Sequence, residues 1–196
     1  LKEKEYIKIS INQLDSLKPH DYFLFSLFNQ YGFRHVSDLK KLLKSQSGKE
    51  LISDTHRLIR DRSFLLLTEK TNIINKTFSI SSEVRKIKDP ISLKLKFKVD
   101  LEIENKNVVC FDKSMIKFPL ILRKWREGDF FYPKGFNGKK KLSKYFKDEK
   151  FSLLEKEKQW LLCSGDNIIW VVGKRADNRY LANNNSKNKF QIMYNG

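Results

Sequence analysis

The chain has 196 residues, of which 40 are Lys or Arg and 23 are Asp or Glu, so its formal net charge at pH 7 is +17. Apolar residues make up 40% and aromatic residues 13% of the sequence, which suffices for a hydrophobic core and excludes global disorder. No apolar run approaches the roughly 18 residues of a membrane span, and the first residues lack the apolar segment of a secretory signal.

The two cysteines, Cys110 and Cys163, each lie in an apolar, strand-like stretch and form no CxxC pair. A disulfide scaffold and a thiolate zinc site are therefore not expected, and a reducing, cytoplasmic setting is favoured. Because the first residue is Leu1 rather than Met, we expect the sequence to be part of a longer protein.

The first part of the chain has helical spacing. Apolar residues recur three and four apart over 11–46, and Pro19 suits the first turn of a helix. We predict that Gly32 ends one helix, that Ser37 caps the next, and that Gly48 closes it. Beyond this point the apolar period changes to two.

A β-rich pattern follows. The segments 52–59 and 64–67 are predicted as antiparallel strands joined by a turn over 60–63. In 91–99 apolar residues alternate with Ser and Lys, which is typical of a half-buried strand with a solvated lysine face. Further strands are predicted over 108–111, 120–122, 160–163, 168–172 and 190–194, and short helices over 141–146 and 153–158.

These patterns predict an α+β protein with two domains. A small helical domain over 1–72 ends in a β-hairpin, and a β-rich α+β domain covers 73–196, with its core at about 118–181.

The positive charge is unevenly distributed. Residues 1–70 carry 13 basic and 9 acidic side chains, whereas residues 71–196 carry 27 and 14. The densest segment, 120–150, has ten basic against four acidic residues, interleaved with aromatic ones. An AT-rich genome would also favour lysine, but such a bias would spread evenly along the chain. The clustering therefore favours a polyanionic partner, with nucleic acid as the first candidate.

Motifs of self-contained catalysis are absent from the sequence. It has no GxGxxG, GxxxxGK[ST] or GxSxG pattern, so no nucleotide-phosphate loop or nucleophile elbow is predicted. The histidines, His20, His35 and His56, are scattered and are interpreted as helix-entry or surface residues. We predict no catalytic and no metal-binding residue in this chain.

The segment 120–150 carries the most specific pattern, LILRKWREGDFFYPKGFNGKKKLSKYFKDEK. The segments 160–166 and 169–175 add WLLCSGD and IWVVGKR. This arrangement resembles the C-terminal domain of bacterial tRNA(Ile)-lysidine synthetases, with the core LRxWxxGDxFxPxGxxGxKKLxxxF and a later strand ending in WVxGxR. The earlier part of the chain is similar to the helical middle region of that family in the segments 27–33, 47–49 and 57–62.

The resemblance implies an ATP-dependent ligase that converts the wobble cytidine of tRNA(Ile) with a CAU anticodon to lysidine, using lysine, ATP and Mg. The family's Ser-Gly-Gly-x-Asp-Ser loop does not occur in these 196 residues. We therefore expect this part to position tRNA without a catalytic site or cofactor of its own. We also expect a cytoplasmic location and no membrane partner, and the resemblance to the family implies a homodimer. The alternative is a stand-alone RNA-binding or protein-interaction module with a related small fold, which the β-subunit of phenylalanyl-tRNA synthetase also contains.

The basic residues of the motif are the predicted contacts to the RNA backbone. They are Arg123, Lys124, Arg126, Lys139, Lys140, Lys141, Lys144 and Arg175. Because Arg123 and Arg126 flank Trp125 at a spacing of three, an extended chain cannot place both on one face, so one of them is expected to be structural.

Other residues of interest are interpreted mainly as structural. Gly128, Gly135 and Gly138 are attributed to sharp turns, and Trp160 and Trp170 to the core. Trp125 is kept as a candidate for base stacking. Arg60 and Arg62, at the predicted turn, are equally consistent with tRNA contact and with a local structural role.

Overall fold

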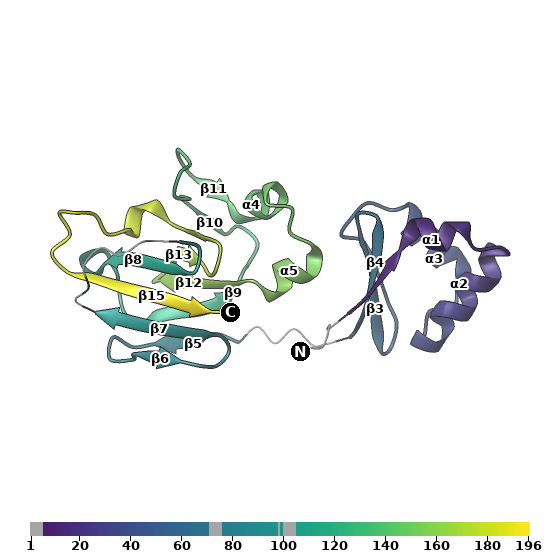
Figure 1. Cartoon of the computed structure of the whole chain (residues 1–196), viewed down its shortest axis with the longest axis horizontal. Coiled ribbons are helices and arrows are strands. Elements are labelled where there is room, and N and C mark those ends of the chain that lie inside the picture. Colours follow the sequence, from purple (N-terminus) through teal and green to yellow (C-terminus); the bar gives the residue numbers. More distant parts are fainter. Residues whose placement is uncertain (1–5, 71–75, 98, 100–104) are drawn as a thin grey trace. The chain divides into compact units, whose positions relative to one another are not determined.

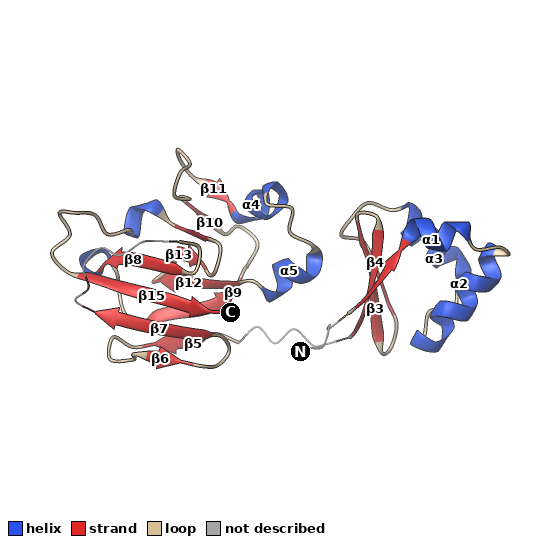
Figure 2. Cartoon of the chain, in the orientation of Figure 1, coloured by secondary structure: helices blue, strands red, loops and turns tan. Residues whose placement is uncertain are grey.

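The structure, a computed structural model, describes residues 6–70, 76–97, 99 and 105–196. The chain divides into two compact units. Unit 1 comprises Leu1–Ile73 with Ser152–Leu154, and unit 2 comprises Ile74–Phe151 with Glu155–Gly196. Both units combine short helices with antiparallel strands (Figures 1 and 2), which confirms the predicted α+β class.

In unit 1, helices cover one face of a four-stranded sheet with the order β1-β4-β3-β2. Its elements are β1 (Ile7–Ser10), α1 (Ile11–Ser16), α2 (His20–Phe28), the 3-10 helix η1 (Asn29–Tyr31), α3 (Val36–Lys44), β2 (Glu50–Ile52), β3 (His56–Asp61) and β4 (Phe64–Glu69). Leu24 and Phe28 of α2 and Leu39 of α3 pack with Leu58 and Leu65 of the sheet. This apolar layer joins the helices to the strands.

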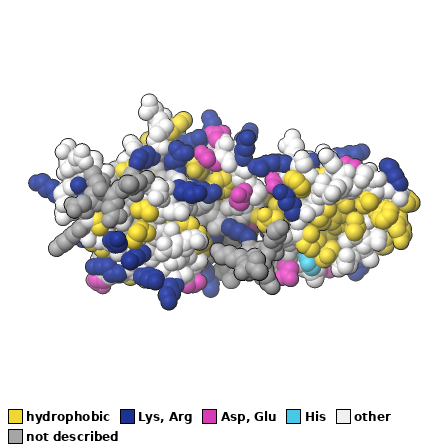
Figure 3. All heavy atoms as spheres, in the orientation of Figure 1, with side chains coloured by type: hydrophobic (Ala, Val, Ile, Leu, Met, Phe, Trp, Pro, Cys, Tyr) yellow, Lys and Arg dark blue, Asp and Glu magenta, His cyan; other side chains and the backbone are white. Residues whose placement is uncertain are grey.

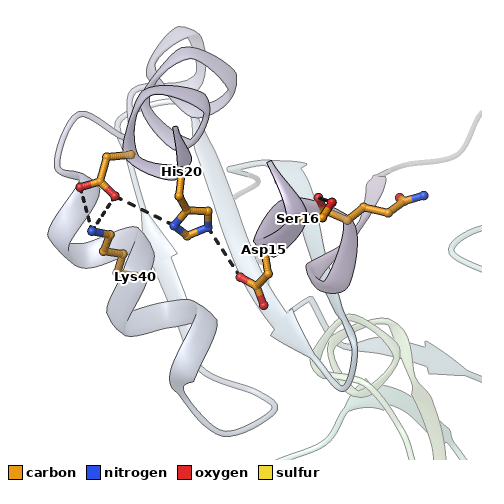
Figure 4. Close-up of polar contacts among 6 residues, drawn as sticks. Asp15, Ser16, His20 and Lys40 are labelled. Carbon is orange, nitrogen blue, oxygen red and sulfur yellow. Dashed lines mark hydrogen bonds and ion pairs between the residues drawn. The ribbon is translucent and has the colours of Figure 1, made fainter. Parts of the chain in front are cut away.

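Polar contacts between the helices of unit 1 lie at its surface (Figure 4). Lys40 of α3 donates from Nζ to Oδ2 of Asp21 in α2 at 2.8 Å. His20, at the start of α2, lies between two carboxylates, with Nε2 3.6 Å from Oδ1 of Asp15 and Nδ1 4.0 Å from Oδ1 of Asp21. Exposed ion pairs contribute only about 0–1 kcal/mol each to stability. The apolar core therefore holds the helices in place, and these polar contacts contribute little.

Helix boundaries in unit 1 differ from two of the sequence predictions. Helix α3 begins at Val36 with His35 as its N-cap, so the predicted cap at Ser37 is wrong. The carbonyl of His35 already accepts from the N–H of Leu39 at 3.3 Å, and Ser37 therefore lies within the first turn. The helix ends at Lys44, so Gly48 belongs to the turn before β2 and not to the cap.

The antiparallel hairpin predicted from 52–59 and 64–67 is present as β3 and β4. Its bounds differ, because the chain turns between Ile52 and His56 and because β3 continues to Asp61, which shortens the predicted turn over 60–63. Strand β2 ends at Ile52 and β3 begins at His56. Between them the hydroxyl of Ser53 accepts from the N–H groups of Thr55 and His56, at 3.3 and 2.9 Å. Such side chain–backbone bonds stabilise a tight turn, which an apolar-period analysis does not detect.

Helix α2 exposes part of its apolar surface. Leu24 and Phe28 are buried, but Tyr22 is 64% and Phe25 44% exposed. Figure 3 shows hydrophobic side chains gathered on this unit. The helical spacing of apolar residues predicts the helix correctly but not which of its residues face solvent.

Unit 2 contains two larger sheets and one small hairpin. The five-stranded sheet has the order β14-β13-β12-β9-β5, the four-stranded sheet β6-β7-β15-β8, and the hairpin pairs β10 with β11. The elements are β5 (Phe78–Ile80), β6 (Lys86–Ile87), β7 (Ser92–Phe97), β8 (Val108–Asp112), η2 (Lys113–Met115), β9 (Leu120–Lys124), β10 (Phe130–Phe131), β11 (Lys140–Lys141), α4 (Leu142–Asp148), α5 (Leu153–Lys158), β12 (Trp160–Ser164), β13 (Asn167–Val171), β14 (Arg175–Ala176), η3 (Asn178–Tyr180) and β15 (Lys189–Asn195).

The five-stranded sheet is buried on both faces. On one face Leu122 and Leu162 pack in a core shared with the four-stranded sheet, including Phe190. On the other face Leu161 packs with Phe146 of α4. Since neighbouring residues of a strand point to opposite faces, burial of both faces explains the continuous apolar runs of β12 and β13.

A β-bulge lies between β12 and β13. The register shifts after Leu162, which pairs with Trp170, because Cys163 pairs with Ile168. Ile169 and Trp170 consequently face the same core. This places the Trp170 side chain, fully buried, between the two larger sheets.

Most predicted elements of unit 2 are present, with one- or two-residue differences at their ends. Strand β7 buries Leu93 and Leu95 and exposes Lys94 and Lys96, as the alternation predicts. The short strands β5, β6, β10, β11 and β14 were not predicted, since two or three residues carry too little periodicity. Among the described residues no helix is long and apolar enough to cross a membrane.

A matched pair of phenylalanines tests the second core of unit 2. Phe131 is fully buried, whereas Phe136 is 49% exposed. We expect Phe131→Ala to lower the free energy of unfolding by about 3–5 kcal/mol and Phe136→Ala by about 0.5 kcal/mol or less. Urea unfolding followed by tryptophan fluorescence measures this, because all three tryptophans lie in unit 2. Equal losses for the two variants would contradict the described core.

Candidate nucleic-acid interface

The predicted basic residues surround the β10–β11 hairpin and α4, which lie together at one edge of unit 2 (Figure 1). In the hairpin, Phe130 pairs with Lys141 and Phe131 with Lys140. Phe131 is buried against α4. Because successive residues of a strand point to opposite faces, Lys140 is half-buried whereas Lys141 is exposed. Figure 3 shows Lys and Arg side chains along this edge.

Arg123 forms a partly buried ion pair with Asp129. Its Nη1 and Nη2 atoms donate to Oδ2 and Oδ1 of Asp129, each at 2.8 Å. The two side chains are only 11% and 13% exposed. The hydrogen bonds to Asp129 raise the pKa of the Arg123 guanidinium. Arg123 is thus occupied within the fold, and it is the structural member expected of the Arg123–Arg126 pair.

The same carboxylate closes the loop that follows β9. Oδ2 of Asp129 accepts from the backbone N–H of Arg126 at 2.8 Å, and the N–H of Asp129 donates to the carbonyl of Arg126 at 3.2 Å. Gly128, inside this loop, has φ +87°, a conformation that glycine adopts without strain. Gly135 and Gly138 also have positive φ, in agreement with the structural interpretation of these glycines.

Lys140 is held by the C-terminal part of α4. Its Nζ lies 2.8 Å from Oδ2 of Asp148, and the lysine side chain is 14% exposed. The hydrogen bond from Lys140 lowers the pKa of the Asp148 carboxyl. Lys140 is therefore less available to a ligand than its neighbours in the Lys139–Lys141 run.

Four of the predicted residues remain exposed at this edge, and we call them the α4 surface: Arg126, Lys139, Lys141 and Lys144. Lys139 Nζ lies 3.6 Å from the centroid of the Phe130 ring. Phe130 is also the strand partner of Lys141. Lys141 is the N-cap of α4, and Lys144 follows three residues later on the same side of the helix. Within the described part of the chain, none of the four forms an ion pair.

Lys124 has different surroundings. Its Nζ donates to the carbonyl of Lys158 at 2.7 Å and lies 4.0 Å from the centroid of the Trp160 ring. Burial lowers the pKa of the Lys124 amine to about 8. The residue is therefore close to losing its charge at neutral to mildly basic pH.

Arg175 lies in a second group of basic residues. Its Nη1 donates to the carbonyl of Lys134 at 3.1 Å, and its Nη2 lies 3.6 Å from Oε1 of Glu149. Lys134, Lys174 and Arg175 line a cavity of about 290 Å³ beside the buried Trp170. Lys134 and Lys174 were not among the predicted site residues, although Lys134 lies within the same sequence motif.

Arg179 is a further basic residue that the sequence did not single out. Its guanidinium donates to both oxygens of Asp177, at 3.0 and 2.9 Å, and Asp177 is fully buried. Asp177 also accepts from the N–H of Tyr132 at 2.9 Å. This acid joins the loop after β10 to the segment after β14, which is a structural function.

The aromatic and turn candidates lie mainly in structural positions. Trp170 is fully buried and Trp160 packs against the same core, as predicted. Trp125 packs edge-on against Phe146 at 5.7 Å between ring centroids. At the β3–β4 turn, Arg62 has φ +53°, and Arg60 has a buried Nε without a hydrogen-bond partner among the described residues.

The described residues contain no group of three or more His, Cys, Asp or Glu side chains that could hold a metal ion. The cysteines, Cys110 and Cys163, are buried free thiols. Burial raises the pKa of the Cys163 thiol to about 11.

The structure is that of an α+β protein with a group of exposed cations at one edge of unit 2, and comparisons with known proteins specify the family. Residues 2–70 match the model described as the TilS substrate binding domain, and residues 120–192 match the model described as the TilS substrate C-terminal domain. The chain belongs to the tRNA(Ile)-lysidine synthase family, of which it contains these two domains.

Curated relatives extend the match over nearly the whole chain. A tRNA(Ile)-lysidine synthase of Parabacteroides distasonis is 40% identical over 195 residues, covering 96% of this chain and 44% of the relative. One of Bacteroides thetaiotaomicron is 36% identical over 176 residues, covering 89% of this chain and 39% of the relative. The chain thus spans less than half the length of these relatives.

A solved structure agrees with the fold. The crystal structure of a TilS C-terminal domain superimposes with a TM-score of 0.53, covering 62% of this chain and 98% of that one. The identity is 20%, so this similarity shows the fold alone.

The Arg123–Asp129 pair allows a test of which arginine of the motif is structural. We expect Arg123→Ala to lower the free energy of unfolding by about 2–4 kcal/mol, because Asp129 would lose the charged partner of a partly buried carboxylate. Arg126→Ala, at an exposed position, is expected to change it by about 0.5 kcal/mol or less. Urea unfolding of both variants decides the question, and an unchanged stability of Arg123→Ala would contradict a structural role.

The environment of Lys124 predicts an unusual titration. We expect its amine to titrate near pH 8, below the ordinary lysine value of 10.5. The sign follows from proton binding: between these pH values the unfolded chain holds the proton and the folded chain does not, so this residue's contribution to stability rises with pH. NMR of ¹³C-labelled lysine side chains measures the titration, with Lys124→Met to assign the signal. Titration at the ordinary value would disprove the described burial.

Proposed function

We propose that this chain is the tRNA-positioning part of a tRNA(Ile)-lysidine synthetase, an ATP-dependent ligase that converts the wobble cytidine of tRNA(Ile) with a CAU anticodon to lysidine. The names of the relatives give tRNA(Ile) and lysidine. The use of ATP and lysine, the wobble cytidine and the CAU anticodon are what the resemblance to the family implies. The observation that carries the role of this chain is the α4 surface, with four exposed cations and no ion pair to a described residue. Such a surface is suited to a polyanionic backbone.

In this proposal the α4 surface contacts phosphates, and those contacts fix the orientation of the tRNA without reading its sequence. Double-stranded RNA is recognised mainly by shape, through phosphates and its shallow groove. The Arg123–Asp129 and Lys140–Asp148 ion pairs hold the hairpin and α4 in place. The lysines of the α4 surface therefore lie on a rigid part of the fold. Arg175 and Lys124 are proposed as secondary contacts, since each is partly engaged within the protein.

The β-rich unit is proposed to hold the acceptor arm of the tRNA, and the helical unit to bridge toward the catalytic domain at the anticodon. ATP, Mg and lysine would act in that domain, outside these 196 residues. No described group of side chains in this chain fits a metal ion, so we derive no step through ATP or Mg here. A cytoplasmic location accords with a tRNA substrate and with two buried free thiols. Homodimer formation stays a prediction.

Salt-dependent binding tests the proposal. We expect the chain to bind an unmodified tRNA(Ile) transcript with an affinity that falls steeply with salt. The fourfold variant Arg126→Ala, Lys139→Ala, Lys141→Ala, Lys144→Ala is expected to bind at least about 100-fold more weakly at 0.1 M salt. The slope of log affinity against log salt should fall in magnitude by about 0.7–0.9 per lost phosphate contact. Fluorescence anisotropy over a salt series measures both quantities.

A control variant with the same loss of charge separates the α4 surface from net charge. Lys86, Lys88, Lys94 and Lys96 are exposed residues on or beside β6 and β7, and their joint replacement by Ala also removes four charges. We expect this control to retain most of the affinity. Equal weakening by the two fourfold variants, or a salt-independent affinity of the unaltered chain, would contradict the proposal.

A further inference from the structure

A further group of basic residues lies where strand β15 begins and strands β7 and β8 end. Strand β15 pairs with β7 on one side and β8 on the other, so its first residues lie beside the last residues of both neighbours. Phe97, at the end of β7, pairs with Phe190, and Asp112, at the end of β8, pairs with Lys189. The N–H of Lys113 donates to the carbonyl of Asn188 at 2.8 Å, which fixes η2 beside the start of β15.

These strand ends enclose a cavity of about 550 Å³. Its wall includes four cationic side chains, an aromatic ring and a serine: Arg85, Lys113, Lys187, Lys189, Phe97 and Ser186. Among the described residues that line it there is no acid. None of these cations belongs to the α4 surface or to the predicted site residues, and the cavity is therefore a separate candidate site.

The arginine of the cavity lies against an aromatic ring. The guanidinium carbon of Arg85 lies 4.4 Å from the centroid of the Phe97 ring, and its Nη1 donates to the carbonyl of Ser82 at 2.9 Å. Phe97 is itself stacked on Phe190, with ring centroids 5.3 Å apart and an angle of 11° between the planes. Nη1 also lies 3.4 Å from the carbonyl of Val84, and the Arg85 side chain remains exposed to solvent.

A carboxylate at the end of β8, Asp112, lies beside the start of β15. Asp112 accepts from the hydroxyl and the N–H of Ser114, at 2.7 and 2.9 Å. A hydrogen bond from Ser186 is the main cause that lowers the pKa of the Asp112 carboxyl, and Lys189 adds to the effect. Asp112 thus interacts with Lys189, and among the described residues that line the cavity the four cations have no acid beside them.

We propose that this cavity binds an unpaired RNA nucleotide, with the base stacked on the Arg85 guanidinium and the flanking phosphates held by Lys113, Lys187 and Lys189. Unpaired bases stack on guanidinium planes as well as on aromatic rings, and stacking accepts every base. Inside a duplex both faces of each base are stacked on neighbouring pairs, so we expect the site to prefer single-stranded RNA. The inference rests on the proposed function, since it assigns an additional contact to the same tRNA substrate.

Replacement of Arg85 tests the base contact. The probes are 5′-labelled hexaadenylate RNA, a 12-base-pair RNA duplex and inorganic polyphosphate, all measured by anisotropy or competition on the full chain. Arg85→Lys keeps the charge and removes the plane. We expect this variant to bind hexaadenylate about tenfold more weakly, in the range of base stacking, and polyphosphate less than about twofold more weakly. Lys96→Ala, an exposed change outside the cavity wall, is the control and should bind all probes nearly as the unaltered chain does.

The joint variant Lys113→Ala, Lys187→Ala, Lys189→Ala should weaken binding of hexaadenylate and polyphosphate alike, because both depend on charge. Equal effects of Arg85→Lys on both probes, tighter binding of the duplex than of hexaadenylate, or no binding of hexaadenylate would each overturn the inference. Binding of the tRNA(Ile) transcript by the unaltered chain is measured in parallel. If it persists while Arg85→Lys has no selective effect, the cavity assignment alone fails; if it is absent, the proposed function fails as well.

Discussion

Burial of both faces of the five-stranded sheet is the constraint on which unit 2 depends. Leu162 and Leu122 point to the four-stranded sheet, while Leu161 points to α4. A strand in this position cannot present a polar row to water, so the apolar runs of β12 and β13 follow from it. The hairpin and α4 must then cover the outer face, and their basic residues lie at its edge.

The same constraint explains why the basic motif is only partly a binding surface. Strand β9 ends beside the second core, and Arg123 there cannot extend into water, being 11% exposed. An arginine in such a place needs a carboxylate, and Asp129 supplies it with two hydrogen bonds. Lys140 similarly reaches Asp148. The ion pairs brace the loop and the hairpin, and the exposed cations between them form the α4 surface.

The fold could be predicted from the sequence where a pattern is long enough to have a period. Strand β7 alternates over six residues, and its buried and exposed side chains are those expected. The hairpin strands β10 and β11 have two residues each, and the bulge beside Cys163 depends on pairing between strands. Neither leaves a local signal, because both result from tertiary packing.

The candidate site was predictable to a smaller degree, for a related reason. Clustering of charge along the sequence indicates the segment but not which cations have partners inside the protein. Lys124 shows this, because its lowered pKa arises from burial beside Trp160 and the carbonyl of Lys158, both distant in sequence. The cavity around Arg85 was missed entirely, since its wall comes from four separate segments, none of which contributes more than two basic residues.

Arginines and lysines of this chain occupy different positions, and the difference follows from their chemistry. Arg57, Arg123 and Arg179 each pair with a carboxylate inside a unit, and the guanidinium carbon of Arg85 lies 4.4 Å from the centroid of the Phe97 ring. A planar, weakly hydrated guanidinium tolerates such places better than a compact, strongly hydrated ammonium. Of the 40 basic residues most are lysines, whose flexible side chains keep their charge in water. In the proposed function the many lysines would therefore supply the general attraction to a polyanion, whereas the few arginines without a carboxylate partner would be suited to contacts with a base.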